Sequence, residues 1–147
     1  KILAYAVQSG VRRAVLTGVT GGRTDHTLWN LGLLPVFAAD LDLCVIDDDC
    51  LMRMIVDGTS FQAPRGLKVS LCPLAGSVDG ITTRGLRWPL RDEALVPGLR
   101  DGISNEVVDS PVEIRVGGER PLLLVIQREG VGADLGLIEA TASVHTT

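Results

Sequence analysis

The stretch VTGGRTDHT, residues 19–27, places two glycines, an arginine and an aspartate at the start of an apolar segment. A strand that passes through a glycine turn into a helix aims backbone N–H groups at an anion. Gly21 and Gly22 allow close backbone approach, and Arg23 can donate two hydrogen bonds to phosphate oxygens. Asp25 can cap the helix or hold a metal ion. The spacing is neither a P-loop nor a dinucleotide fingerprint, so phosphate binding and a simply capped helix both stay open.

The flanking sequence predicts a helix over residues 1–9, a buried strand over 11–19 and a second helix over 25–39. Pro35 is expected to kink or shorten the second helix. Four apolar positions of that helix are expected on its inner side: Leu28, Leu31, Leu34 and Phe37. One strand cannot make a sheet, so its neighbours are expected from a deleted N-terminal portion or from a partner chain. A chain that starts at Lys1 in mid-pattern is therefore interpreted as a fragment or a processed product.

After about residue 40 the sequence changes to short β-rich runs separated by glycine, proline or aspartate turns. This pattern is typical of an antiparallel β-sandwich. The predicted fold class is an α/β fragment, helix–strand–helix, followed by an antiparallel β-sandwich, with an incomplete N-terminal nucleotide domain. The expected divisions are 1–40 for the α/β piece, 41–128 for the sandwich and 129–147 for a tail that is loose or docks late.

Composition narrows the classes of partner. The net charge is −4 and the chain is 46% hydrophobic, which argues against nucleic acid, because phosphate binding needs a basic surface. No apolar run approaches the ~20 residues of a membrane span, so no membrane partner is expected. Three cysteines without a CxxC pair favour reduced core thiols in a cytoplasmic protein: Cys44, Cys50 and Cys72.

Other chemistry-bearing residues have simpler explanations. The run Asp47–Asp49 suggests a metal site but lacks the spacing of a calcium loop, so a solvated hairpin turn is favoured. Ser70 and Cys72 alternate with apolar residues in an expected strand, and a nucleophile there would need a histidine partner. Neither His26 nor His145 makes a case for one.

Four segments in order resemble the thiamine pyrophosphokinase family. GVTGGRTDHTLWNLGLL is similar to that family's GGRxDHxLxNLxLL segment, and the other three segments are VSLCPLAGSVDGITTRGLRWPL, GISNEV and VEIRVGGERPLLLVIQ. The similarity spans roughly residues 1–127. Any one of these motifs alone is weak, but their combination at family-like spacing is specific.

The resemblance implies an enzyme that moves a pyrophosphoryl group from ATP to the hydroxyl of thiamine, giving thiamine diphosphate and AMP. It implies ATP and Mg²⁺ as cofactors, thiamine as substrate and a homodimer with the thiamine site at its interface. Catalysis of such a displacement is mostly positioning and neutralisation of charge.

The resemblance also implies roles for residues of the glycine loop. Gly21, Gly22 and Arg23 would bind the nucleotide, and Arg23 and Asp25 would be catalytic. Asp25 would hold the metal ion or orient the thiamine hydroxyl. His26 is a weaker candidate, because a hydrogen bond at the helix start explains it equally well.

In the sandwich the resemblance implies three substrate-binding residues. Trp88 would offer a flat face to the aminopyrimidine or the cationic thiazolium, with a core tryptophan as the alternative. Ser104 and Asn105 would hydrogen-bond the pyrimidine edge, with a plain β-turn as the alternative. Trp29 is interpreted as a core or interface residue.

One departure from the family pattern matters most, because the further acidic residues expected upstream of the glycine loop are not in this sequence. The parent protein is therefore expected to be a thiamine diphosphokinase, and the 147 residues alone to be inactive. The alternatives are a related pterin-alcohol pyrophosphokinase, a non-catalytic thiamine-binding or dimerisation module, and an unrelated protein of similar architecture.

Overall fold

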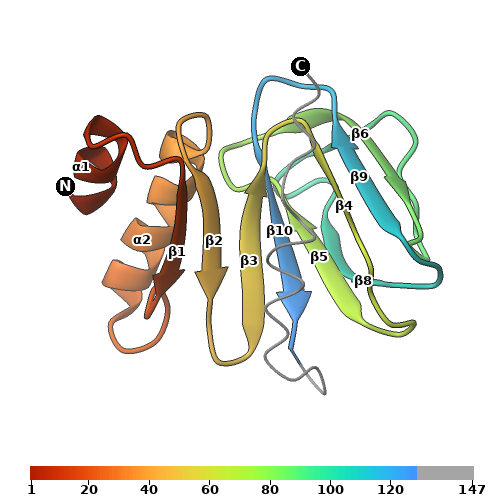
Figure 1. Cartoon of the computed structure of the whole chain (residues 1–147). Coiled ribbons are helices and arrows are strands. Elements are labelled where there is room, and N and C mark those ends of the chain that lie inside the picture. The colour runs from red at the N-terminus through yellow and green to blue at the C-terminus, as the bar shows by residue number, and fades with distance from the viewer. Residues whose placement is uncertain (129–147) are drawn as a thin grey trace.

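A computed structural model describes residues 1–128 as two helices and ten strands (Figure 1). The helices are α1 (Ile2–Gln8) and α2 (Thr24–Phe37). The strands, in chain order, are β1 (Arg13–Thr17), β2 (Asp42–Ile46), β3 (Cys50–Ile55), β4 (Gly58–Phe61), β5 (Lys68–Cys72), β6 (Val78–Arg84), β7 (Glu93–Leu95), β8 (Gly102–Glu106), β9 (Val112–Val116) and β10 (Leu122–Gln127). The predicted order of helix, strand, helix and then short strands is confirmed.

The larger sheet has six strands in the order β1-β2-β3-β10-β5-β8. β1 lies parallel to β2, with Arg13 opposite Asp42 and Thr17 opposite Ile46, and the other pairs are antiparallel. The expectation that the first strand has no neighbour in its own chain is therefore wrong. The segment 42–46, assigned to the sandwich, is apolar enough to be buried on both faces and also serves as the second strand of a β-α-β unit.

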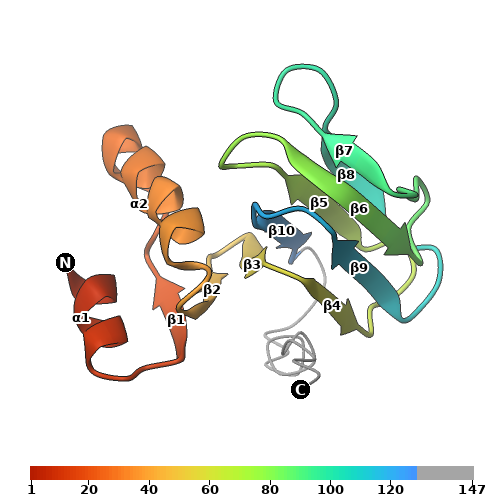
Figure 2. The same cartoon turned by 90° about the horizontal axis from the view of Figure 1, so that it is seen from above.

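The smaller sheet has four strands in the order β4-β9-β6-β7 and packs on the larger sheet, as Figure 2 shows from above. Strand residues that alternate along both sheets meet between them and form one aliphatic core. Its fully buried members include Phe61, Leu71, Ile81, Leu95, Ile114, Leu122 and Leu124. The predicted sandwich architecture is confirmed, with a mixed sheet in place of a purely antiparallel one.

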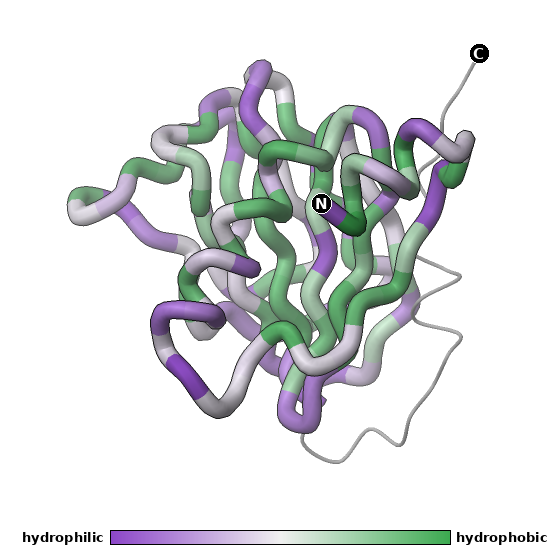
Figure 3. Tube along the Cα trace, turned by 90° about the vertical axis from the view of Figure 1, so that its left-hand side faces the viewer, coloured by the Kyte–Doolittle hydropathy of each residue, from purple (hydrophilic) through white to green (hydrophobic). Residues whose placement is uncertain are grey.

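α2 covers the other face of the larger sheet at its β1 end, and α1 lies beside β1 at this edge of the sheet (Figure 1). A second core forms there from Leu3, Leu34, Leu41, Leu43, Val45, Met52, Met54 and Leu123. Leu34 is buried as predicted, and Leu31 and Phe37 pack against this core, but Leu28 is exposed. Leu28 therefore corrects the predicted inner face. Figure 3, which views this side, shows hydrophobic positions through the middle of the molecule and many of the hydrophilic positions at the outer turns.

A buried ion pair joins β2 to β3, where the β-α-β unit meets the sandwich. Arg53 is only 2% exposed. Its Nη2 lies 2.7 Å from Asp42 Oδ1 and 2.8 Å from Oδ2, and Arg13 Nε lies 3.4 Å from the same carboxylate. A buried charge is tolerated only with such a partner, so this contact ties the two halves of the sheet together.

All three cysteines are unbridged, with Cys44 buried and Cys50 and Cys72 half-buried. Burial raises the pKa of each thiol, which is the behaviour of packing residues rather than of reactive thiolates. Within residues 1–128, no helix is both long enough and apolar enough to cross a membrane.

Candidate functional site

The glycine loop connects the end of β1 to the start of α2. Gly18, Gly21 and Gly22 have φ values of 66°, 84° and 67°, a backbone region that favours glycine. Asn30 Nδ2 donates to Val19 O at 3.2 Å, which anchors the loop to α2. The loop is thus a turn that only this run of glycines permits at low cost.

Arg23 and Asp25, the two candidate catalytic residues, pair with each other at the mouth of α2. Arg23 Nε lies 3.1 Å from Asp25 Oδ1 and Nη2 lies 2.5 Å from Oδ2. Both side chains are exposed, and the Arg23 guanidinium holds the pKa of the Asp25 carboxyl below its usual value. The pair presents a charged fork and a fully ionised carboxylate to solvent.

Asp47 is a third residue at this loop, and the interpretation of the sequence missed it. Because β1 and β2 are parallel, their carboxyl ends reach the same sheet edge, where α/β sheets bind ligands. The Thr20 hydroxyl donates to the Asp47 carboxylate, and Arg128 Nη1 donates to Asp47 O at 2.8 Å. The run Asp47–Asp49 does form the predicted turn between β2 and β3. The missed signal was the parallel pairing of β1 and β2.

The donor set around Asp25 is small for a metal ion. Among residues 1–128, no three or more His, Cys, Asp or Glu side chains are grouped so that they could hold one. Mg²⁺ is commonly held by one or two carboxylates together with waters and substrate phosphates. Asp25 can supply one carboxylate once Arg23 releases it, so these residues do not form a resident metal site by themselves. Metal binding by Asp25 stays a prediction.

Trp88 lies beside β8, which is the edge strand of the larger sheet opposite β1. Its side chain is 57% exposed, so it is not a core tryptophan. It borders a hollow of about 190 Å³ lined by Leu71, Trp88, Pro89, Leu90, Arg100, Asp101, Gly102, Ile103 and Asn105. This exposed aromatic face beside a small hollow can accept a flat ring.

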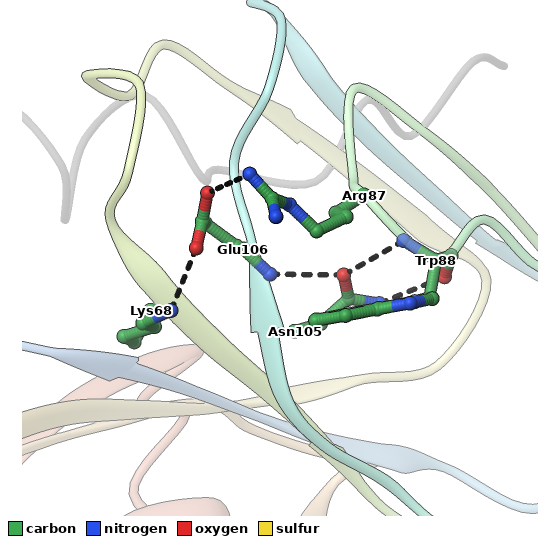
Figure 4. Close-up of polar contacts among 5 residues, drawn as sticks. All are labelled: Lys68, Arg87, Trp88, Asn105 and Glu106. Atoms are coloured by element: carbon green, nitrogen blue, oxygen red, sulfur yellow. Dashed lines mark hydrogen bonds and ion pairs between the residues drawn. The ribbon is translucent and has the colours of Figure 1, made fainter.

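Asn105 clamps the backbone of Trp88 (Figure 4). Its Oδ1 accepts hydrogen bonds from Trp88 N at 3.1 Å and Glu106 N at 2.9 Å, and its Nδ2 donates to Trp88 O at 2.8 Å. Asn105 is only 5% exposed, and its Nδ2 carries a second hydrogen that can face the hollow. The structure therefore brings Trp88 and Asn105 together and gives Asn105 a positioning contact that the sequence did not reveal.

Ser104, the third sandwich candidate, lies in a strained backbone conformation. Its φ is 59°, which costs a non-glycine residue of order 1–3 kcal/mol. Its N–H donates to Ser70 Oγ at 3.0 Å, and the β5–β8 register shifts between Val69 and Leu71. Such irregularities re-aim side chains near functional sites. Here the exposed Ser104 lies between two residues that line the hollow, Ile103 and Asn105, and is not part of the lining itself.

Gly85 sets the course of the GLRWPL segment. Its φ is 79°, and an added Cβ would lie 2.6 Å from Asp109 O. Its own carbonyl accepts hydrogen bonds from Val108 N at 2.8 Å and Asp109 N at 3.2 Å. Only glycine fits this turn, which delivers Trp88 to the β8 side of the sandwich.

Three charged residues beside Trp88 were also missed. Glu106 Oε1 lies 2.9 Å from Arg87 Nη2, and Glu106 Oε2 lies 2.7 Å from Lys68 Nζ. Lys68 and then Arg87 hold the pKa of the Glu106 carboxyl below its usual value. Arg87 and Glu106 directly neighbour Trp88 and Asn105 in the chain, but their cross-strand pairing could not be deduced without the register of β5 and β8.

The two groups of predicted site residues are not brought together. The loop of Gly21, Gly22, Arg23 and Asp25 follows β1, and Asn105 lies on β8, the other edge strand. Five strand spacings separate β1 from β8, which is about 24 Å. Trp88 and Arg23 of one chain therefore lie too far apart to contact the same small ligand.

Comparison with known proteins connects this site to a family. Residues 61–119 match the family model described as "Thiamin pyrophosphokinase, vitamin B1 binding domain". This range is therefore similar to the vitamin B1 binding domain of the thiamine pyrophosphokinase family. The matched range contains Trp88, Ser104 and Asn105, whereas the glycine loop lies outside it.

Relatives extend the similarity beyond that range. Thiamine pyrophosphokinase 2 of Oryza sativa subsp. japonica is 28% identical over 106 residues, which cover 69% of this chain and 39% of the relative. The thiamin pyrophosphokinase structure from Geobacillus thermodenitrificans gives a TM-score of 0.75 at 26% identity, covering 88% of this chain and 60% of that one. The structure from Bacillus subtilis, at 22% identity and a TM-score of 0.75, shows the same fold. The chain thus spans about two fifths of the rice enzyme's length.

Proposed function

We propose that this chain carries the thiamine-binding part of a thiamine pyrophosphokinase, which transfers pyrophosphate from ATP to the thiamine hydroxyl and yields thiamine diphosphate and AMP. The single observation that carries the proposal is the coincidence of the matched range 61–119 with the hollow at Trp88. All the residues that line this hollow lie within the matched range.

Thiamine would bind at Trp88 through its rings. The exposed indole offers stacking worth about 0.5–1.5 kcal/mol beyond the area that it buries. Ser104 Oγ and the second hydrogen of Asn105 Nδ2 would meet the polar edge of the aminopyrimidine, and the hydrogen bonds from Asn105 would fix the Trp88 backbone that carries the indole.

The glycine loop would act on the phosphates. Arg23 can form two parallel hydrogen bonds to phosphate oxygens once its contact with Asp25 opens. The released Asp25 carboxylate would then orient the thiamine hydroxyl or serve Mg²⁺ that arrives with ATP. Asp47 would fix the loop through Thr20 while this exchange occurs.

A homodimer is part of the proposal because the two groups of residues lie at opposite sheet edges. Trp88 of one protomer and Arg23 of another can approach the same thiamine, whereas those of a single protomer are about five strand spacings apart. The chain of 147 residues is expected to bind thiamine without turning it over, because residues 1–128 contain no group of three or more His, Cys, Asp or Glu side chains that could hold a metal ion.

A non-catalytic thiamine-binding module is the second candidate. It is favoured by the same scarcity of grouped carboxylates in the described range and by the restriction of the family match to the vitamin B1 binding domain. Both functions predict thiamine binding at Trp88, and they differ in whether AMP is released.

The test uses the Trp29→Phe variant, which leaves Trp88 as the one tryptophan of the chain. Thiamine should quench or shift its fluorescence in a saturable way, and a pterin alcohol should not compete. AMP release from Mg-ATP is then measured with and without thiamine, and no thiamine-dependent release is expected from these 147 residues.

Two results would redirect the proposal. Equal binding of thiamine and the pterin alcohol would favour the related pyrophosphokinase that uses a pterin. Stoichiometric thiamine-dependent AMP release would show a complete catalytic site and reject the module.

A further inference from the structure

Arg87 lies over one face of the Trp88 indole. Its Cζ is 5.8 Å from the ring centroid, within the range of a cation–π interaction. Figure 4 shows the indole edge-on, with Arg87 and Glu106 on the same side of the ring. One face of the proposed stacking platform is therefore already occupied by a cation.

Arg87 is held in that place by contacts at both ends. Its backbone N donates to Glu106 O at 2.8 Å, and its guanidinium pairs with the Glu106 carboxylate at 2.9 Å. Lys68 binds the other carboxylate oxygen at 2.7 Å, so Glu106 is itself fixed from β5. The chain Lys68–Glu106–Arg87 is a continuous ionic network that ends on the indole.

The hollow lies away from this network. Its lining includes Trp88 and Asn105 and two charged residues, Arg100 and Asp101. None of Lys68, Arg87 and Glu106 is part of it. A ligand ring that enters the hollow can therefore meet the indole without displacing Arg87.

We propose that Glu106 is a positioning residue that keeps Arg87 on one face of Trp88, and that this cation makes the platform select a neutral ring over a cationic one. Both faces share one π system, so a cation on the first face weakens its attraction for a second cation on the other. Glu106 cannot attract a cationic ring instead, since Lys68 and Arg87 already neutralise it. The two charged residues that line the hollow, Arg100 and Asp101, carry opposite charges and together add no net charge to it. This inference rests on the proposed thiamine site and specifies which half of a two-ring ligand stacks there.

The experiment compares two probe rings in the Trp29→Phe background: an aminopyrimidine, at a pH where it is neutral, and a permanently cationic N-methylthiazolium. The parent should bind the aminopyrimidine more tightly. Arg87→Gln should strengthen thiazolium binding by about two- to fivefold, the size of an exposed cation–π interaction, and leave aminopyrimidine binding unchanged. Arg12→Gln removes the same charge before β1, at the far edge of the sheet, and should change neither.

The fluorescence of Trp88 without any ligand gives a second measurement of whether Arg87 lies over the indole. A nearby cation shifts indole emission, so Arg87→Gln and Glu106→Gln should shift Trp88 emission relative to the parent, whereas Arg12→Gln should not. An unchanged ring preference in Arg87→Gln, or emission unaltered by both variants, overturns the inference. If neither thiamine nor either ring binds the parent, the proposed function fails separately, and the apo spectra alone then decide whether Arg87 is held over Trp88.

Discussion

The Trp88 region and the glycine loop differ in how many contacts within the chain hold their side chains in place. Around Trp88, three hydrogen bonds to Asn105, a glycine turn and an ionic network hold the backbone and the ring. At the glycine loop, the side chains of Arg23 and Asp25 are exposed and pair with each other, and the loop is anchored through Thr20 and Asn30. A ring-binding surface must be rigid before its ligand arrives, whereas charged groups that meet phosphate must exchange partners. This difference fits the proposal that the chain binds thiamine but needs further groups to act on it.

The largest expected effect on stability comes from removing the ion pair between Asp42 and Arg53, which joins β2 to β3. Asp42→Ala leaves the Arg53 charge buried without its main partner, so the free energy of unfolding should fall by about 3 kcal/mol. Chemical denaturation should show one shifted transition for both regions. Asp40→Ala, an exposed aspartate two residues away, is the control and should change stability by less than about 0.5 kcal/mol. Two separate transitions in Asp42→Ala would show that the regions fold independently.

The next effect is confined to the Trp88 region. Gly85→Ala forces a side chain into a positive-φ turn and against Asp109 O, which should cost about 2 kcal/mol. Gly32→Ala in α2 is the matched control, because a Cβ there meets no atom within 4 Å and alanine favours the helix by up to about 1 kcal/mol. Thermal unfolding should show opposite signs for the two variants, and equal signs would contradict the assigned role of Gly85.

A smaller loss is expected when the clamp is altered. Asn105→Asp keeps an acceptor for Trp88 N but removes the donor to Trp88 O and adds a charge at a buried position. Stability should fall by about 1–2 kcal/mol, and thiamine affinity should fall with it. Ser104→Ala keeps the backbone bond to Ser70, so it should weaken thiamine binding with little change in Tm. Equal destabilisation by both variants would return Ser104 to a purely structural role.

The smallest expected effect is a pH dependence at Trp88. Lys68, with Arg87, lowers the pKa of Glu106 below its ordinary value of 4.5, so the ionic network contributes fully above that pH. It is lost only as the pH falls through the lower value in the folded protein. Trp88 emission in the Trp29→Phe protein should stay constant from neutral pH to about 4.5 and change below it. Arg87→Gln should remove that change, and a transition near neutral pH would contradict this account of Glu106.

Most helices and strands could be predicted from local patterns. The strands are short β-rich segments separated by glycine, proline or aspartate turns, and the glycines at 21 and 22 mark the turn before α2. The parallel pairing of β1 with β2 could not, since it depends on a contact across a whole helix. Leu28 was misplaced for a similar reason, because helical spacing shows which residues share a face but not which face meets the sheet. Trp88 and Asn105 could be chosen by resemblance, yet their clamp and the Lys68–Glu106–Arg87 network depend on cross-strand register.

The most direct test of the account is calorimetric titration of thiamine into the wild-type chain, Trp88→Leu and Asp25→Asn. The account predicts saturable binding by the wild type, the same affinity for Asp25→Asn, and binding at least about tenfold weaker for Trp88→Leu, a loss of about 1.4 kcal/mol. Circular dichroism must first show that Trp88→Leu keeps its fold, as expected for a side chain that is more than half exposed. Folded Trp88→Leu that binds thiamine like the wild type, or Asp25→Asn that loses binding as strongly, would contradict the assignment of thiamine binding to the Trp88 region.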